Sequence, residues 1–141
     1  MEAFEKKVRE SFGQQLFMPT IGAEMISVSR GIVEIRFPFS SRLTQQHGFV
    51  HAGALRSIMD SACGYAALSV APEEADVLSV EFKVNLLAPG KGESFVARAA
   101  VKRAGKRLAV CTADAFAINA GEEKLIATML ATIMNIHWKQ G

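Results

Sequence analysis

An apolar segment near the middle of the chain constrains the fold more than any other feature. Residues 51–71 are rich in alanine, leucine, isoleucine and methionine, and the stretch from Ser61 to Pro72 carries no charge. This pattern predicts one long, mostly buried helix. A span of the membrane is excluded, because the uncharged stretch is too short and contains serine, glycine and tyrosine. The rest of the chain must therefore supply a surface that covers this helix.

Most of the remaining chain alternates apolar and polar residues with the period of strands. A hairpin is expected over 23–39, and four more strands follow Pro72, separated by turns near 89–92, 105 and 119–122. The clearest alternation predicts a core face on one strand, which consists of Leu78, Val80, Phe82, Val84 and Leu86. A second strand carries a face of small residues that lets another element approach closely: Ala109, Cys111, Ala113, Ala115 and Ala117.

The order of these elements predicts an α+β fold in which an antiparallel sheet wraps around one long central helix. Residues 1–141 form a single domain in this interpretation, with an N-terminal helix over 1–18 and the central helix over 51–71. Because such a sheet keeps two edges and a second face, we expect a homodimer.

Composition excludes several classes of protein. The formal net charge is only +2, and no basic stripe with interleaved aromatic residues is present, so nucleic acid is not an expected partner. Cys63 and Cys111 are isolated from each other and from histidine, which argues against a disulfide or a metal site. No secretory signal is visible at the start of the sequence, so a cytoplasmic protein is expected.

The residues most suggestive of chemistry lie at the start of the predicted central helix. His51, Ala52 and Gly53 stand where the first backbone N–H groups of a helix lack internal partners, which suits an anionic oxygen. Nine positions after His51 comes Asp60, whose neighbours in sequence are mostly apolar. A carboxylate in such surroundings is a candidate general base.

On these residues the sequence resembles the hotdog-fold acyl-CoA thioesterases of the phenylacetic acid degradation (PaaI-like) type. That family carries Asn, then Gly, then His-Gly-Gly, with an acidic residue nine positions after the histidine; here His51, Gly53 and Asp60 match. The resemblance covers nearly the whole chain. It implies that Asp60 activates the water that attacks the thioester carbonyl, while the N–H of Ala52 holds the developing oxyanion.

The resemblance also implies a site shared between two protomers. Ser79 matches a hydroxyl residue beside the acid, and Gln45 matches the asparagine that polarises the thioester. Asp60 and Ser79 of one chain would then face Gln45 and Ala52 of the other, in a homodimer and as a dimer of dimers in a homotetramer. Two departures concern the substrate: Gln45 lengthens the amide arm, and Ala52 adds a methyl group where the family has glycine. No metal and no cofactor is implied, apart from coenzyme A as part of the substrate.

Structural interpretations of the same residues stay open. Asp60 could pair with Arg56 on an exposed helix face, His51 could serve only the helix start, and Ser79 could be an ordinary surface serine. Cys63 is expected to pack as a small apolar residue rather than to act as a nucleophile. Four basic residues are either solvated or contact the phosphates of coenzyme A: Lys91, Arg103, Lys106 and Arg107.

Two other functions compete with thioester hydrolysis. One is a hotdog hydratase or dehydratase acting on acyl thioesters, and the other is an acyl-CoA binding module without catalysis. The acyl group is left open between aryl-acetyl and straight-chain types, although Phe49, Met59 and Tyr65 suggest an apolar pocket.

Overall fold

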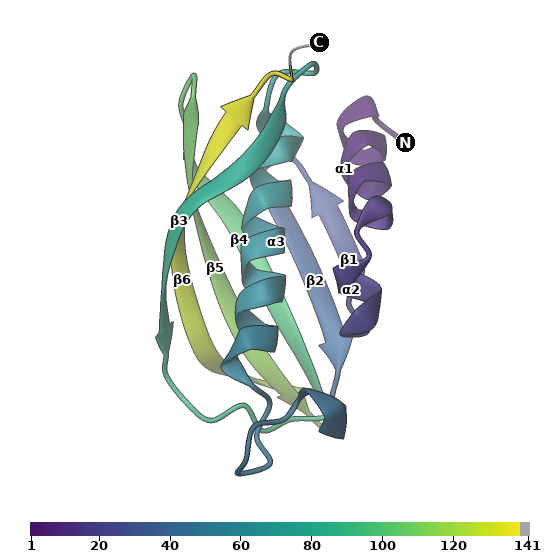
Figure 1. Ribbon diagram of the computed structural model, residues 1–141, viewed down its shortest axis with the longest axis vertical. Helices are drawn as coiled ribbons and strands as arrows, with labels where there is room; N and C mark the ends of the chain where they lie inside the picture. Colours follow the sequence, from purple (N-terminus) through teal and green to yellow (C-terminus); the bar gives the residue numbers. More distant parts are fainter. Residues whose placement is uncertain (139–141) are drawn as a thin grey trace.

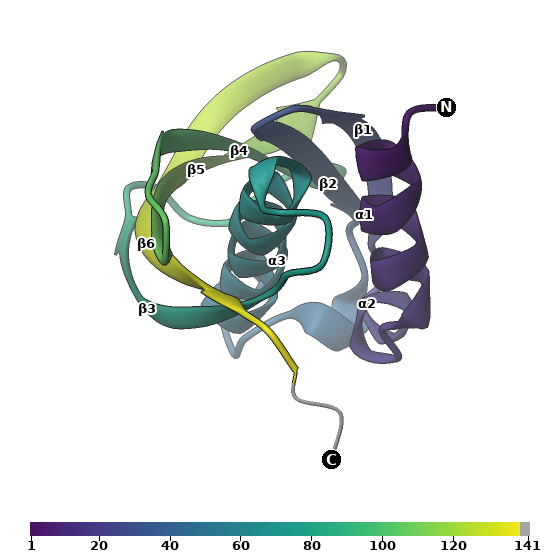
Figure 2. The same ribbon diagram turned by 90° about the horizontal axis from the view of Figure 1, so that it is seen from above.

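The computed structural model describes residues 1–138 and contains one curved sheet around a central helix (Figures 1 and 2). Six antiparallel strands follow the order β1-β2-β4-β5-β6-β3. The elements are α1 (Ala3–Gln14), α2 (Phe17–Thr20), β1 (Glu24–Ser29), β2 (Ile32–Pro38), the 3-10 helix η1 (Ser41–Leu43), α3 (Ala52–Val70), β3 (Asp76–Leu86), β4 (Ser94–Ala104), β5 (Leu108–Asn119) and β6 (Glu122–Ile136). The predicted hotdog architecture is confirmed, and positions 139–141 of the predicted domain lie outside the described residues.

Helix α3 lies in the concave side of the sheet, as Figure 2 shows, and α1 lies beside it. The buried residues of α3 include Ile58, Met59 and Ala62, which pack in one core with Phe37 and Phe95 of the sheet. The predicted small-residue face of β5 is buried throughout, from Ala109 to Ala117. Small side chains at these positions let the helix approach the middle of the sheet closely. No helix within residues 1–138 has both the length and the apolar character needed to cross a membrane.

The N-terminal helix is shorter than predicted. Helix α1 ends at Gln14, Gln15 is extended with φ −70° and ψ 129°, and a separate short helix begins at Phe17. Pro19 explains the break: proline has no N–H to donate to the carbonyl four residues earlier, and its ring clashes with that carbonyl. In a continuous helix this carbonyl would belong to Gln15. As a result Leu16, which the spacing of Phe4, Val8 and Phe12 would place on the apolar face of one continuous helix, is exposed.

Strand β3 departs from strict alternation at one residue. A bulge at Val80 interrupts its pairing with β6. On one side of the bulge Ser79 pairs with the buried Ile133, and on the other Phe82 pairs with the buried Ala131. Directly paired residues share a face, so Ser79 and Phe82 both point to the α3 side of the sheet. Alternation alone placed them on opposite faces, and the extra residue in the bulge removes that difference.

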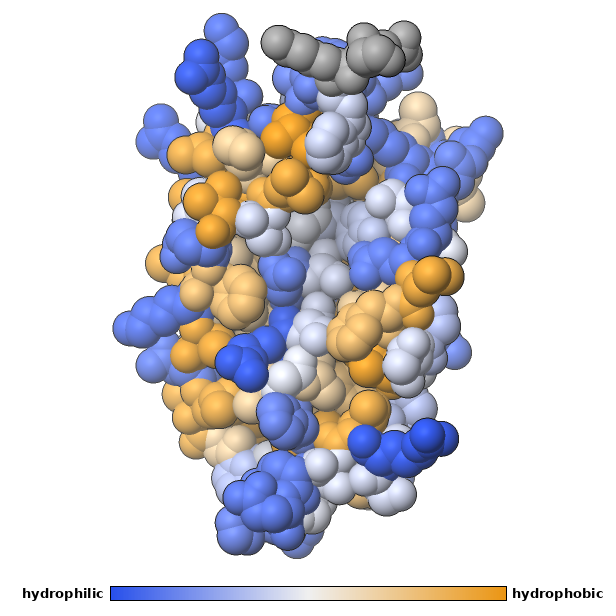
Figure 3. All heavy atoms as spheres, in the orientation of Figure 1, coloured by the Kyte–Doolittle hydropathy of each residue, from blue (hydrophilic) through white to orange (hydrophobic). Residues whose placement is uncertain are grey.

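The predicted core face of β3 is wrong for the single chain in two respects: the bulge divides its residues between the two faces of the strand, and most of them are exposed. Four of its five apolar side chains are 41–57% exposed: Leu78, Val80, Phe82 and Leu86. Within residues 1–138 strand β3 is an edge strand that pairs only with β6, and of its five apolar residues only Val84 packs against the core. Figure 3 shows apolar side chains gathered over this side of the molecule. The edge of the sheet thus combines unpaired backbone groups with apolar surface.

Candidate active site

His51 begins α3 by capping it. Its backbone is extended, and its Nδ1 accepts a hydrogen bond of 2.7 Å from the N–H of Gly53. A side chain at Gly53 would place its Cβ 2.8 Å from that Nδ1, which explains the glycine at this position. The interpretation of His51 as a helix-start residue is confirmed. Its cap uses the N–H of Gly53, while the N–H of Ala54 donates to the carbonyl of His51.

Ala52 is left with a free backbone donor at this helix start. Among residues 1–138 its N–H donates no hydrogen bond. Ala52 also lines a cavity, so the donor sits at the positive end of a helix next to open space. A negatively charged or strongly polarised oxygen is the chemical partner that such a position favours.

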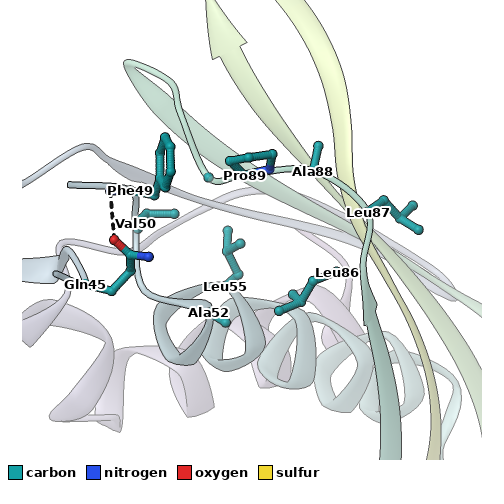
Figure 4. Close-up of a pocket in the computed structure, with 10 residues that line it drawn as sticks. Gln45, Phe49, Val50, Ala52, Leu55, Leu86, Leu87, Ala88 and Pro89 are labelled. Atoms are coloured by element: carbon teal, nitrogen blue, oxygen red, sulfur yellow. Dashed lines mark hydrogen bonds between the residues drawn. The ribbon is translucent and has the colours of Figure 1, made fainter. Parts of the chain in front are cut away.

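Gln45 supplies a second donor to the same cavity. Its Oε1 accepts hydrogen bonds from the backbone N–H groups of His47 (2.6 Å) and Phe49 (3.2 Å). Because the oxygen is engaged by two N–H groups, the amide cannot be turned over, and Figure 4 shows its nitrogen on the side of Ala52 and Leu55. This Nε2 has no acceptor within the described part of the chain, so the side chain presents N–H groups to the cavity.

The cavity has a volume of about 450 Å³ and lies between the start of α3 and the loop after β3 (Figure 4). Its remaining wall is mostly apolar and consists of Phe49, Val50, Leu55, Leu86, Leu87, Ala88, Pro89 and Gly90. The two loops are joined by a 2.8 Å hydrogen bond from the N–H of Val50 to the carbonyl of Gly90. The position of Gln45 therefore depends on the loop after β3.

Gly90→Ala should loosen this junction. An added Cβ would lie 2.2 Å from Cγ1 of Val50 and 3.2 Å from its carbonyl oxygen, so the loops must move apart. We expect the free energy of unfolding to fall by about 1–3 kcal/mol, as for other overpacked sites, measured by denaturant titration. Gly13→Ala is the control, because nothing lies within 4 Å of its added Cβ. Equal stability of the two variants would contradict the tight contact.

Asp60 and Ser79 form a direct pair in the structure. The hydroxyl of Ser79 on β3 donates a hydrogen bond of 2.6 Å to Oδ1 of Asp60 on α3. The bulge at Val80 makes this possible, because it leaves Ser79 facing the helix. Asp60 forms no ion pair with Arg56 within the described residues, so the interpretation as an exposed helical pair is wrong. Ser79 is likewise more than an isolated surface serine.

This pair lines a second cavity, with a volume of about 330 Å³. The other lining residues come from α1 and the residue after it, α3 and β3: Ser11, Gln15, Ser61, Gly64, Tyr65, Leu68, Asp76, Val77 and Leu78. Sequence reasoning assigned none of the α1 residues or Asp76 to a site, and no local signal marks them, since their approach depends on the docking of α1. Of the three residues expected in an apolar pocket, Phe49 and Tyr65 line cavities, whereas Met59 is buried in the core.

The two groups of predicted residues lie apart in one chain. Ala52 and Asp60 are separated by about 12 Å along α3, at ~1.5 Å per residue. Gln45 and Ala52 line the first cavity, and Asp60 and Ser79 line the second. A single chain therefore holds two half-sites: one with two free hydrogen-bond donors and one with a carboxylate and a hydroxyl.

The four predicted basic residues are also divided. Lys91 follows the loop that lines the first cavity, whereas Arg103, Lys106 and Arg107 lie at the exposed β4–β5 hairpin. Lys106 lines a hollow with Val70 at the other end of α3, a helix roughly 28 Å long. The four residues therefore do not form one cluster in the single chain, because the hairpin lies at the opposite end of the helix from Lys91.

Both cysteines are buried and free. Burial raises the pKa of Cys111 to about 11, and burial, with smaller contributions from Cys111 and Asp60, raises the pKa of Cys63 even further. Neither thiol is available as a thiolate near neutral pH. The expected packing role of Cys63 is confirmed. Within residues 1–138 no group of three His, Cys, Asp or Glu side chains is arranged to hold a metal ion.

The thiols provide a simple prediction. In the folded protein at pH 8 neither cysteine should react with a disulfide reagent at the rate of a free thiol, because both lie in the core. In denaturant both should react fully, and absorbance of the released chromophore measures each state. Fast reaction of one thiol in the native protein would contradict the burial of that residue.

Comparison with known proteins gives consistent results. Residues 47–124 match the thioesterase superfamily. A crystal structure of a thioesterase family protein from Silicibacter pomeroyi is 51% identical, with a TM-score of 0.94 over 96% of this chain and 100% of that one. A curated Saccharolobus solfataricus protein named "Putative esterase" is 31% identical over 126 residues, 89% of this chain and 81% of that protein. The PaaI protein from the phenylacetic acid degradation operon of E. coli shares the fold, at 20% identity and a TM-score of 0.84, over 94% of this chain and 93% of that one.

Proposed function

The chain belongs to the thioesterase superfamily, and from this premise we propose that it hydrolyses acyl-CoA thioesters to a carboxylic acid and coenzyme A. Water would attack the thioester carbonyl with the assistance of Asp60. The observation that carries this proposal is the 2.6 Å hydrogen bond from Ser79 to Asp60 at the wall of a cavity.

The Ser79–Asp60 pair has the hydrogen-bonding capacity to hold a water molecule. Ser79 uses its only proton on Oδ1 of Asp60, so its oxygen remains an acceptor. Oδ2 of Asp60 has no donor among the described residues and is also an acceptor. A water that donates to both oxygens keeps a lone pair for the carbonyl carbon. As the carbon–oxygen bond forms, Asp60 takes the proton.

The free donors of Ala52 and Gln45 suit the other requirement of the reaction. The carbonyl oxygen gains negative charge when water adds, and donors already aimed at that oxygen stabilise the transition state. The N–H of Ala52 lies at the start of a long helix, and the orientation of the Gln45 amide is fixed by two backbone bonds. The longer arm of Gln45 still brings an N–H group to the cavity.

We propose that the two half-sites meet across a homodimer. The ~12 Å between Ala52 and Asp60 along α3 prevents one chain from using both on the same carbonyl. The apolar side chains and unpaired backbone of the β3 edge support association with a second copy, since such edges are normally covered. A dimer of dimers is the further assembly expected from the family resemblance.

The rate enhancement expected from the proposed groups is large enough for thioester hydrolysis. General-base assistance contributes roughly 10²–10⁴-fold and a well-placed donor roughly 10²–10³-fold, together about 5–9 kcal/mol of barrier. A thioester is an activated acyl group, so no covalent nucleophile is needed. The buried Cys63, with its raised pKa, would be a poor nucleophile in any case.

Two finer assignments belong to the same proposal. Similarity of fold to the E. coli PaaI protein supports a PaaI-like enzyme, with aryl-acetyl or straight-chain acyl groups as substrates. Lys91 is the basic residue nearest in sequence to the first cavity's loop, so we assign it to the phosphates of coenzyme A. We assign a second contact with these phosphates to three residues of the β4–β5 hairpin: Arg103, Lys106 and Arg107.

A panel of acyl-CoA thioesters tests the proposal directly. Phenylacetyl-CoA and straight-chain acyl-CoAs are incubated with the protein while free thiol is followed, and at least one should be hydrolysed. An enoyl-CoA is included because loss of its absorbance without release of thiol would favour a hydratase. Tight binding without turnover of any thioester would favour a binding module and would overturn the assignment as a thioesterase.

A further inference from the structure

The cavity beside Asp60 and Ser79 extends toward the start of β3 and the side of α1. We propose that this cavity receives the acyl group of the substrate, and that Asp76 makes the enzyme select uncharged acyl groups over those that carry a carboxylate. The inference rests on the proposed thioesterase function, since it takes the thioester carbonyl to lie next to Asp60.

The charge of the cavity carries the argument. Two carboxylates line it, those of Asp60 and Asp76, and no lysine, arginine or histidine of the described chain lines it. Asp76 is held at the wall by two contacts: Oδ1 accepts from the N–H of Val77 at 2.8 Å, and Oδ2 accepts from the indole of Trp138 at 3.2 Å. A negatively charged group that enters this cavity meets like charges in fixed positions.

The basic side chain bonded to the segment before Asp76 is Lys7. Lys7 donates hydrogen bonds to the carbonyls of Pro72, Glu73 and Ala75, at 3.1, 2.8 and 2.6 Å. Lys6 and Lys7 line a neighbouring hollow that Asp76 also borders, and neither lines the cavity with Asp60, so their charges reach Asp76 from outside this cavity and offset it only in part. The same acidic lining disfavours the phosphates of coenzyme A, which leaves the acyl end of the substrate for this cavity.

The far wall of the cavity also carries two hydroxyl groups, those of Tyr65 and Ser11. Tyr65 is only 7% exposed, and its hydroxyl accepts a 2.8 Å hydrogen bond from Nε2 of Gln15. It also shares a 3.3 Å hydrogen bond with the hydroxyl of Ser11. The two hydroxyl groups carry two protons, and the bond between them uses one. When Gln15 donates in this way, the other proton is left for an uncharged polar atom of a bound acyl group or for water.

A matched pair of substrates tests the role of Asp76. Succinyl-CoA and isocaproyl-CoA have acyl groups of nearly the same shape, but the first ends in a carboxylate and the second in an isopropyl group. Each is assayed by thiol release, after subtraction of spontaneous hydrolysis, with the wild type, Asp76→Asn and Glu74→Gln. Glu74→Gln is the control because it removes the same charge from an exposed position outside the cavity.

We expect Asp76→Asn to raise kcat/KM for succinyl-CoA by about 5–20-fold, the size of one partly screened repulsion, and to leave isocaproyl-CoA within about twofold. Glu74→Gln should change neither value by more than about twofold. In the wild type, raising the salt concentration should increase the ratio of succinyl to isocaproyl turnover, and in Asp76→Asn this increase should shrink. A merely structural effect of the substitution would lower both rates together and would not alter the salt dependence of their ratio.

The outcomes separate this inference from the function on which it rests. Suppose that the wild type hydrolyses isocaproyl-CoA, and that Asp76→Asn changes neither the ratio of succinyl to isocaproyl turnover nor the salt dependence of this ratio. The role of Asp76 is then overturned while the thioesterase assignment stands. If the wild type hydrolyses no thioester, the proposed function fails and the selectivity fails with it. Hydrolysis of isocaproyl-CoA by Asp76→Asn also shows that this variant folds with an intact site.

Discussion

Asp60→Asn should lower kcat/KM for acyl-CoA hydrolysis by about 10²–10⁴-fold, the range for loss of a general base. Asparagine has nearly the same size, and its amide oxygen still accepts the hydrogen bond that Ser79 donates to Asp60 at 2.6 Å. It cannot take a proton from water at neutral pH, however. The measurement is thiol release under conditions where substrate is limiting, with far-ultraviolet circular dichroism as the check on folding.

Asp114→Asn is the matched control for this variant. Oδ1 of Asp114 accepts a hydrogen bond of 2.8 Å from the hydroxyl of Thr128, so the carboxylate has the same kind of partner as Asp60. Asp114 lies on β5 between Ala113 and Ala115, which face α3, and therefore points to the opposite face of the sheet. We expect its activity to stay within about twofold of the wild type. Undiminished hydrolysis by Asp60→Asn would eliminate the proposed mechanism.

Mixing two inactive variants should restore activity. Gln45→Ala removes a hydrogen-bond donor from one half-site and should lower kcat/KM by about 10²–10³-fold. Asp60→Asn disables the other half-site. When the two chains are unfolded and refolded together, about half of the dimers contain one of each, and each of these has one intact site. We therefore expect roughly a quarter of the wild-type activity from an equal mixture.

A second mixture serves as the control for this complementation. Asp60→Asn and Ser79→Ala both alter the same half-site, because the two side chains pair within one chain. A dimer of these two variants has no intact site, so this mixture should recover nothing. Recovery in neither mixture would contradict the sharing of the site between protomers. Equal recovery in both would also contradict it, because the control mixture contains no dimer with an intact site.

Much of the architecture could be predicted from local pattern. The apolar helix, the alternating strands and the small-residue face of β5 all appear in the sequence, because burial imposes a period on each element separately. The capping role of His51 was also predictable, since it depends on residues 51–53 alone. Asp60 could be singled out as an acidic residue in an apolar segment, although its partner could not be identified from the helix itself.

The remaining features depend on contacts between segments far apart in the chain. Ser79 reaches Asp60 because of a bulge in the pairing of β3 with β6, and no residue near Val80 signals that bulge. Ser11 lines one cavity with Asp76 and Tyr65 because α1 docks beside α3 and β3 runs along the same helix. The separation of Lys91 from the β4–β5 hairpin likewise depends on how the strands are arranged around the helix. Local periodicity thus predicts which elements form and which faces are apolar. Strand register and helix docking, which rest on long-range hydrogen bonds and packing, decide which side chains meet.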